Sequence, residues 1–170
     1  MTRKDGGSAS DEAALDLTEH KLGSRHVFAG RVLQVYVDDV SLPDGSTAQR
    51  EWIDHPGAAA VLPVLSDGTA VLVRQYRYAS RREFLEIPAG KLDGKGENPE
   101  DAARRELAEE TGLRARELEH LGSQCNCIGY SSEVIHLYLA RDPEPGDAAP
   151  DDGEYVEVVH VPFHELVSLV

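Results

Sequence analysis

Apolar runs separated by turn residues occur along most of the chain and predict β-strands. Ala58 to Leu65 and Thr69 to Arg77 are two such runs, and the turn signal Ser66-Asp67-Gly68 between them predicts a hairpin of buried strands. Pro43-Asp44-Gly45-Ser46 is a second turn signal, and it predicts an N-terminal hairpin. The strands of that hairpin are predicted at residues 32–40 and 47–53, and further strands at residues 83–87, 134–140 and 155–161.

After residue 97 the pattern becomes that of a helix. Asn98 suits the N-cap, Pro99 the first helical position and Thr111-Gly112 the C-terminal stop, which together predict a helix of about 13 residues. Its apolar side consists of Ala102, Ala103, Leu107 and Ala108. Residues 141–153 have the composition of a loop, and a second helix is predicted to begin within residues 162–166. Mixed strands with few helices indicate a single α/β or α+β domain.

The charge balance narrows the functions that this domain can have. The 170 residues carry 31 Asp and Glu against 17 Lys and Arg, a formal charge of −14. Nucleic acid polymers and anionic membranes both need a basic patch, so we expect neither as a partner. The longest apolar run, Ala58 to Leu65, is far shorter than the roughly 20 residues that span a bilayer.

The two cysteines, Cys125 and Cys127, indicate a reducing compartment. One residue separates them, and on a strand their side chains would face opposite ways, which suits neither a disulfide nor a shared metal. We therefore expect buried or half-buried thiols and a cytoplasmic location. Residues 1–20 lack the apolar core of a signal peptide and are expected to form a mobile tail.

Three glutamates of the predicted helix are candidates for a functional site. Glu106, Glu109 and Glu110 are spaced i, i+3 and i+4, so their carboxylates share one face, and Arg105 can relieve part of their repulsion. Such a face is either a solvated acidic surface or a site for a hard divalent cation, which prefers several oxygen ligands. The surrounding residues favour the cation site.

The wider spacing is Glu97-x7-Arg105-Glu106-Leu107-x-Glu109-Glu110-x-Gly112-Leu113. A match of this kind occurs by chance roughly once in 10⁸–10⁹ registers. The pattern resembles the Nudix box, the signature of hydrolases that cleave a nucleoside diphosphate linked to another group. One departure is an extra residue between Gly90 and Glu97, in a Gly-rich loop where insertions are tolerated. The resemblance implies the Nudix fold, a mixed β-sheet sandwiched between helices.

The resemblance also implies a mechanism. A pyrophosphate is anionic and repels a water nucleophile, and metal ions held by carboxylates neutralise this charge and lower the pKa of a bound water. The implied cofactor is Mg²⁺, with Mn²⁺ able to substitute. The implied metal ligands are Glu106, Glu110, Glu109 and the backbone carbonyl of Ala89. Glu109 and Arg105 belong to the implied catalytic set, in which Arg105 orients a glutamate and Glu97 has a supporting role.

Further segments are similar to the ADP-ribose pyrophosphatase branch of the Nudix hydrolases. They cover residues 55–61, 73–77, 83–90, 129–133 and 153–158, in that order. The implied substrate is ADP-ribose, a small nucleoside diphosphate. The implied substrate-binding residues are Arg77, Gln75, Arg50 and Gly90, where Arg50 reaches the substrate in some members across a dimer. Glu154 is the implied general base, with Asp152 as the alternative. Trp52 is either a stacking partner for adenine or part of the core or an interface.

Two departures keep other interpretations open. Where this branch has a Pro-Gly pair the chain has Ile128-Gly129, and Tyr130 follows near a position where dinucleoside polyphosphate hydrolases carry a tyrosine. Members of this branch also continue with a longer helix beyond the equivalent of residues 164–170, whereas this sequence ends at residue 170. The alternatives are therefore hydrolysis of dinucleoside polyphosphates or other nucleoside diphosphate sugars, or a Nudix fold that binds a nucleotide as a sensor without catalysis. A purely structural acidic domain is the remaining alternative, which the glutamate pattern disfavours.

The same resemblance divides the chain and predicts its assembly. Residues 1–20 form the tail, residues 21–54 the N-terminal β-hairpin region, and residues 55–170 the Nudix hydrolase domain. The N-terminal region is expected to build a homodimer.

Overall fold

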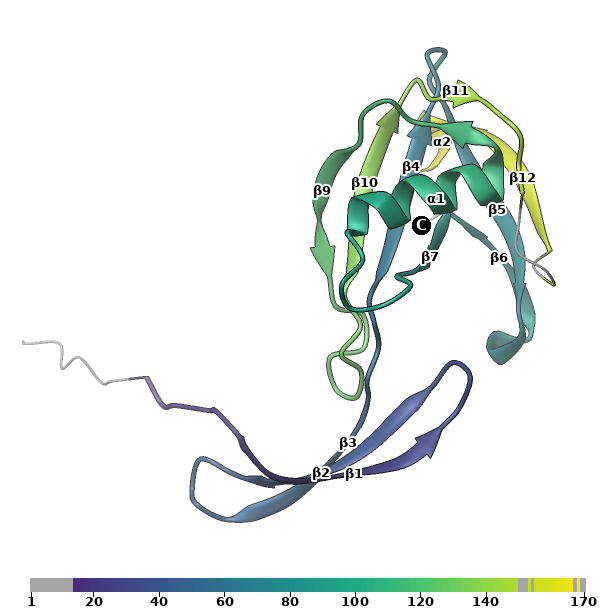
Figure 1. Ribbon diagram of the computed structural model, residues 1–170. Helices are drawn as coiled ribbons and strands as arrows, with labels where there is room; N and C mark the ends of the chain where they lie inside the picture. The colour runs from purple at the N-terminus through teal and green to yellow at the C-terminus, as the bar shows by residue number, and fades with distance from the viewer. Residues whose placement is uncertain (1–13, 150–152, 154, 167, 169–170) are drawn as a thin grey trace, which may run out of the picture.

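A computed structural model describes residues 14–149, 153, 155–166 and 168. They form a three-stranded N-terminal sheet, a seven-stranded main sheet and a small two-stranded sheet (Figure 1). The larger strands are β1 (His20–Ala29), β2 (Gln34–Ser41), β3 (Thr47–Ile53), β4 (Ala58–Val64), β5 (Thr69–Arg77), β6 (Arg82–Glu86), β9 (Glu119–Gln124), β10 (Ile135–Arg141) and β12 (Val156–Pro162). The short elements are the 3₁₀ turn η1 (Tyr78–Ser80) and strands β7 (Ala89–Lys91), β8 (Leu113–Arg114) and β11 (Glu144–Pro145). The helices are α1 (Pro99–Thr111) and α2 (Phe163–Leu166).

The N-terminal sheet contains the predicted hairpin of β2 and β3 and one strand that the pattern did not predict. This additional strand, β1, pairs antiparallel with β2, with register shifts at Lys21/Gly23 and His26/Phe28. Its side chains are almost all exposed. Because β1 buries no face, its sequence has no reason to alternate apolar and polar residues, and periodicity could not reveal it.

The main sheet has the order β12-β5-β4-β10-β9, with β4 and β10 parallel and the other neighbours antiparallel. The predicted hairpin of β4 and β5 is confirmed, but the two strands pair only beside the turn, at Val64 and Ala70. Further along, β4 pairs with β7 and β5 pairs with β6 (Figure 1). The hairpin therefore splays open, and β6 and β7 line the opening.

Helix α1 begins and ends as predicted. The Asn98 side chain accepts a hydrogen bond from the Glu100 N–H at 3.0 Å, and Gly112 ends the helix with φ of 71°. Glycine adopts this left-handed conformation without steric cost.

The apolar side of α1 packs on one face of the sheet. Ala102, Ala103 and Leu107 have no exposed surface and lie against Val61 and Tyr138. Ala108 is only partly buried. A mixed sheet with few helices is thus confirmed, and its best-packed region is the layer between α1 and strands β4 and β10.

Two details differ from the sequence expectations. Cys125 and Cys127 lie after β9 rather than within a strand, and both are free thiols, but Cys125 is exposed instead of buried or half-buried. The expected loop at residues 141–153 contains β11, which pairs with β8.

None of the helices in the described residues is long and apolar enough to cross a membrane. The expected mobile tail falls largely outside the described residues.

Candidate active site

The site is built where α1 meets β7. Glu106 and Glu110 lie one helical turn apart and are only 8% and 3% exposed. The Glu110 carboxylate accepts a hydrogen bond from the Ala89 N–H at 3.0 Å. A Cβ atom added to Gly90 would lie 2.0 Å from the carboxylate of Glu106. The absence of a side chain at Gly90 therefore allows the buried carboxylates to approach the backbone of β7.

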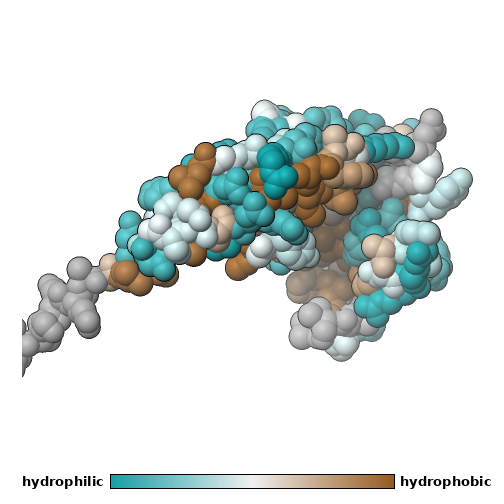
Figure 2. All heavy atoms as spheres, turned by 90° about the horizontal axis from the view of Figure 1, so that it is seen from below, coloured by the Kyte–Doolittle hydropathy of each residue, from teal (hydrophilic) through white to brown (hydrophobic). Residues whose placement is uncertain are grey.

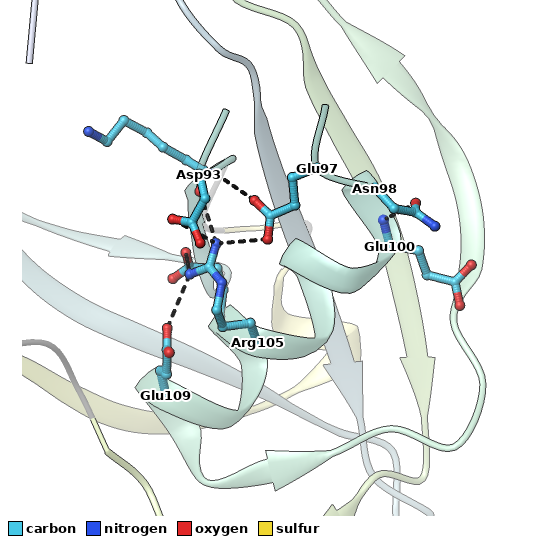
Figure 3. A network of polar contacts seen from close by, with 8 residues as sticks. Asp93, Glu97, Asn98, Glu100, Arg105 and Glu109 are labelled. Atoms are coloured by element: carbon cyan, nitrogen blue, oxygen red, sulfur yellow. Dashed lines mark hydrogen bonds and ion pairs between the residues drawn. The ribbon is translucent and has the colours of Figure 1, made fainter. Parts of the chain in front are cut away.

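Arg105 organises the acidic residues around this contact. Its Nη1 lies 2.5 Å from Glu106 Oε1 and 3.3 Å from Glu109 Oε2, and its Nη2 lies 3.5 Å from Glu97 Oε1. Nη2 also donates to the carbonyl of Lys91 on β7 at 3.1 Å. Figure 3 shows the guanidinium among the carboxylates of Asp93, Glu97 and Glu109. Arg105 thus joins the loop of residues 92–98 to α1 and β7.

The electrostatics keep this arginine charged. Burial acts to lower the pKa of Arg105, but the hydrogen bond that Arg105 donates to Glu106 and the charges of Glu106, Asp93 and Glu97 outweigh it and raise the pKa. Glu97 also accepts a hydrogen bond from the Asp93 N–H at 2.5 Å. Glu97 therefore holds both the loop of residues 92–98 and the arginine in place.

A cavity of about 370 Å³ opens beside Gly90 in the splayed hairpin. Its lining residues are Ala58, Ala60, Arg77, Glu86, Ile87, Ala89, Gly90, Lys91, Gln124, Glu133, Ile135 and Leu137. The predicted phosphate contact Arg77 and the predicted residues Ala89 and Gly90 are thereby brought together. Gln75 lies two residues before Arg77 on β5, half-buried, and so on the same face of the strand.

Arg50 is not brought to this cavity within one chain. It lies on β3 of the N-terminal sheet, where its guanidinium is held by Glu19 at 2.6 and 2.9 Å. Trp52, on the same strand, stacks on Tyr36 at 5.2 Å, and Tyr36 stacks on His26 at 4.4 Å. The indole N–H of Trp52 is buried and has no hydrogen-bond partner among the described residues.

A family described as the NUDIX domain matches residues 54–169, most of the chain. The chain belongs to the Nudix family. A second family, described as the nucleoside diphosphate sugar hydrolase N-terminal domain, matches residues 19–53. The Nudix resemblance of the helix pattern is confirmed, because the match spans α1, β7 and the cavity.

Relatives cover nearly the whole of this Nudix protein. The ADP-ribose pyrophosphatase of Bacillus subtilis is 40% identical over 91% of this chain and 84% of its own length. The methanol dehydrogenase activator of Bacillus methanolicus is 39% identical over 89% of this chain and 83% of its own. A crystal structure described as an ADP compounds hydrolase is 25% identical, with a TM-score of 0.79 over 92% of this chain and 85% of that one.

The residues at the β7–α1 contact fit a divalent metal ion. Four carboxylates, those of Asp93, Glu97, Glu106 and Glu109, share the guanidinium of Arg105, and Glu110 adds a fifth nearby. Carboxylate and carbonyl oxygens are the ligands that hard cations prefer, and buried carboxylates need a compensating charge. Among the described residues no three acidic, histidine or cysteine side chains already form a cage. The carboxylates are held instead by Arg105 and Ala89.

Some cavity residues were missed from the sequence, and one predicted residue lies outside the structure. Glu86, Lys91 and Glu133 line the cavity, although no spacing rule singled them out. Glu86 follows an apolar residue in a predicted strand, and only the pairing of β5 with β6 shows what it meets. The predicted base Glu154 and its alternative Asp152 lie outside the described residues.

Proposed function

We propose that this Nudix protein hydrolyses the pyrophosphate bond of ADP-ribose to AMP and ribose 5-phosphate, with Mg²⁺ or Mn²⁺ bound at the β7–α1 contact. The observation that carries the proposal is the burial of Glu106 and Glu110 against the backbone of β7, beside a cavity that also contains Arg77.

Each residue at the site has a distinct proposed role. Glu106, Glu109 and Glu110, with the carbonyl of Ala89, hold the metal ion, which supplies charge neutralisation and a more acidic bound water. Arg105 orients the carboxylates that it contacts. Arg77 presents a guanidinium, a group suited to phosphate, to the cavity.

The remaining roles concern access and proton transfer. Gly90 lets the Glu106 carboxylate approach the backbone of β7, because any side chain there would meet it. Gly90 also lines the cavity, where its backbone is proposed to contact the substrate. Gln75 lies beside Arg77 on β5 and is proposed to contact substrate as well. Glu154 is proposed to take the proton of the attacking water, with Asp152 as the alternative base.

ADP-ribose is preferred as substrate because of the relatives. The B. subtilis relative is named for ADP-ribose and shares 40% identity with most of this chain. The N-terminal match to the nucleoside diphosphate sugar hydrolase domain favours other nucleotide sugars as a second candidate. Dinucleoside polyphosphates remain a third, although Tyr130 does not line the cavity and its hydroxyl donates to Cys127 Sγ at 3.3 Å.

A substrate panel tests the proposal. ADP-ribose, other nucleoside diphosphate sugars and dinucleoside polyphosphates are incubated with Mg²⁺ or Mn²⁺, and the products are separated by chromatography. We expect the highest kcat/KM with ADP-ribose and no turnover in excess chelator. Preferred turnover of another substrate would contradict the substrate, while tight ADP-ribose binding without hydrolysis would indicate a sensor.

A homodimer formed through the N-terminal sheet belongs to the same proposal. Apolar side chains are exposed on and around this sheet, and Figure 2 shows hydrophobic patches on the face that carries it. They are Leu15, Leu17, Leu22, Val27, Phe28, Val32 and Leu33. Exposed apolar groups of this number favour association. A dimer would also allow Arg50 to reach the partner's cavity. The free thiols support a cytoplasmic location.

A further inference from the structure

The cavity's arginine is held by a carboxylate that the proposed mechanism does not use. Arg77 Nε lies 2.8 Å from Glu86 Oε1, and Arg77 Nη2 lies 2.7 Å from Glu86 Oε2. The two groups form the parallel pair of hydrogen bonds that an arginine and a carboxylate prefer. Both residues line the same cavity as Gly90.

The strand register shows what this pair does to the arginine. On β5 and β6, Val73 lies opposite Glu86 and Arg77 lies opposite Arg82, so Arg77 and Glu86 share one face. Arg77 is four residues beyond Val73, which is about 13 Å along the strand. The pair can form only because the arginine side chain reaches back along β5, away from η1 and towards the end of β6 that leads into β7.

The pair with Glu86 restrains an arginine that lies at the end of a strand. Arg77 is the last residue of β5, and its side chain is 44% exposed. A long exposed side chain at a strand end samples several rotamers, and binding must then order it. Glu86 is less exposed, at 29%, and lies three residues before Ala89 on the same continuous segment as β7.

We propose that Glu86 is a positioning residue that orients the Arg77 guanidinium for the phosphates of the substrate. The inference rests on the proposed function, since it assigns a phosphate contact to Arg77. A guanidinium has a second donor edge besides the Nε–Nη2 edge that Glu86 engages. With Glu86 holding the first edge, the second edge is presented in a defined direction. The carboxylate then acts through the arginine and not on the reacting atoms.

A matched pair on the same hairpin provides the control. Arg74 Nη1 lies 3.0 Å from Glu83 Oε2, on the other face of β5 and β6. Neither Arg74 nor Glu83 lines the cavity beside Gly90. Glu83→Ala therefore removes a cross-strand ion pair from the same two strands at a residue that does not line the cavity, while Arg74 keeps its contact with Glu157 on β12.

The experiment is a double-mutant cycle with Glu86→Ala, Arg77→Ala and the double variant, with Glu83→Ala as control. For ADP-ribose in Mg²⁺ we expect Glu86→Ala to raise KM about tenfold while kcat changes less than about threefold, because ordering Arg77 assists binding. In the Arg77→Ala background the further effect of Glu86→Ala should be below about twofold. Glu86→Gln, which keeps one acceptor, should be intermediate, and Glu83→Ala should match the wild type.

Several outcomes would overturn the proposal. An unchanged KM in Glu86→Ala would do so, as would a Glu86→Ala effect that persists in full without Arg77, since it would show a direct or general structural role. Thermal unfolding of each variant separates loss of folding from loss of positioning.

Failure of the proposed function would be visible separately, in the wild type. If the wild type prefers another substrate of the panel, the same cycle is measured with that substrate. If it hydrolyses none, the dissociation constant of ADP-ribose replaces KM, with the same expected ratios and the same outcomes counting against the role of Glu86.

Discussion

The N-terminal sheet leaves nearly all of its side chains unburied, whereas the Nudix domain encloses a core. In the N-terminal sheet only Asp38 and Val40 are buried. In the Nudix domain, α1 and strands β4 and β10 enclose a core whose members include Leu107 and Val61, with no exposed surface. A three-stranded sheet without a buried face has little to stabilise it alone. We therefore expect the Nudix domain to fold without the N-terminal sheet, and the N-terminal sheet to need a partner surface.

The strongest test of the comparison removes a core side chain. Leu107→Ala should lower the free energy of unfolding by about 2–5 kcal/mol, because it leaves a cavity under α1. Chemical denaturation monitored by circular dichroism would measure it. Leu22→Ala, at a 61% exposed position of β1, is the matched control and should leave the stability of the monomer nearly unchanged. Similar losses from both would show that the N-terminal sheet has a core of its own.

The next test separates folding from chemistry within the Nudix domain. Glu110→Gln keeps the side-chain shape and an acceptor for the Ala89 N–H, so the variant should fold normally. Loss of the buried negative charge should reduce turnover at least about 100-fold, through weaker metal binding. Steady-state kinetics and metal titration by calorimetry would measure the two effects. A wild-type rate would contradict the assignment of the site.

Association through the N-terminal sheet is tested by making its surface polar. Phe28→Ser removes a ring that is 53% exposed, and it should weaken the dimer at least about tenfold without unfolding the Nudix domain. Sedimentation at several concentrations would measure the dissociation constant. A wild type that is monomeric at working concentration would refute the proposed dimer and leave Arg50 without a route to the cavity.

The smallest expected effect concerns the cap of α1. Asn98→Ala removes the hydrogen bond to the Glu100 N–H and should cost about 1 kcal/mol of stability. Because the cap lies away from the cavity, kcat should remain within about twofold. Denaturation and kinetics on the same sample would show whether stability and activity separate as expected.

Much of the site was predictable because its signals are local. Asn98, Pro99 and Gly112 determine where α1 begins and ends through contacts with residues a few positions away. The i, i+3 and i+4 spacing then places Glu106, Glu109 and Glu110 together, and Arg105 within reach of Glu109. The turn residues around Gly45 and Gly68 likewise predict the two hairpins, and both glycines have positive φ.

The sequence by itself therefore determined α1, the two hairpins and the glutamate cluster, since each depends on neighbours along the chain. Only the tertiary structure decided that β1 exists as a strand, because an exposed strand leaves no periodic trace. It also decided that the β4–β5 hairpin splays open to admit β6 and β7, that Gly90 meets Glu106, and that Glu86 holds Arg77. These contacts join residues whose distance apart is set by strand pairing, a property that no short window of sequence contains.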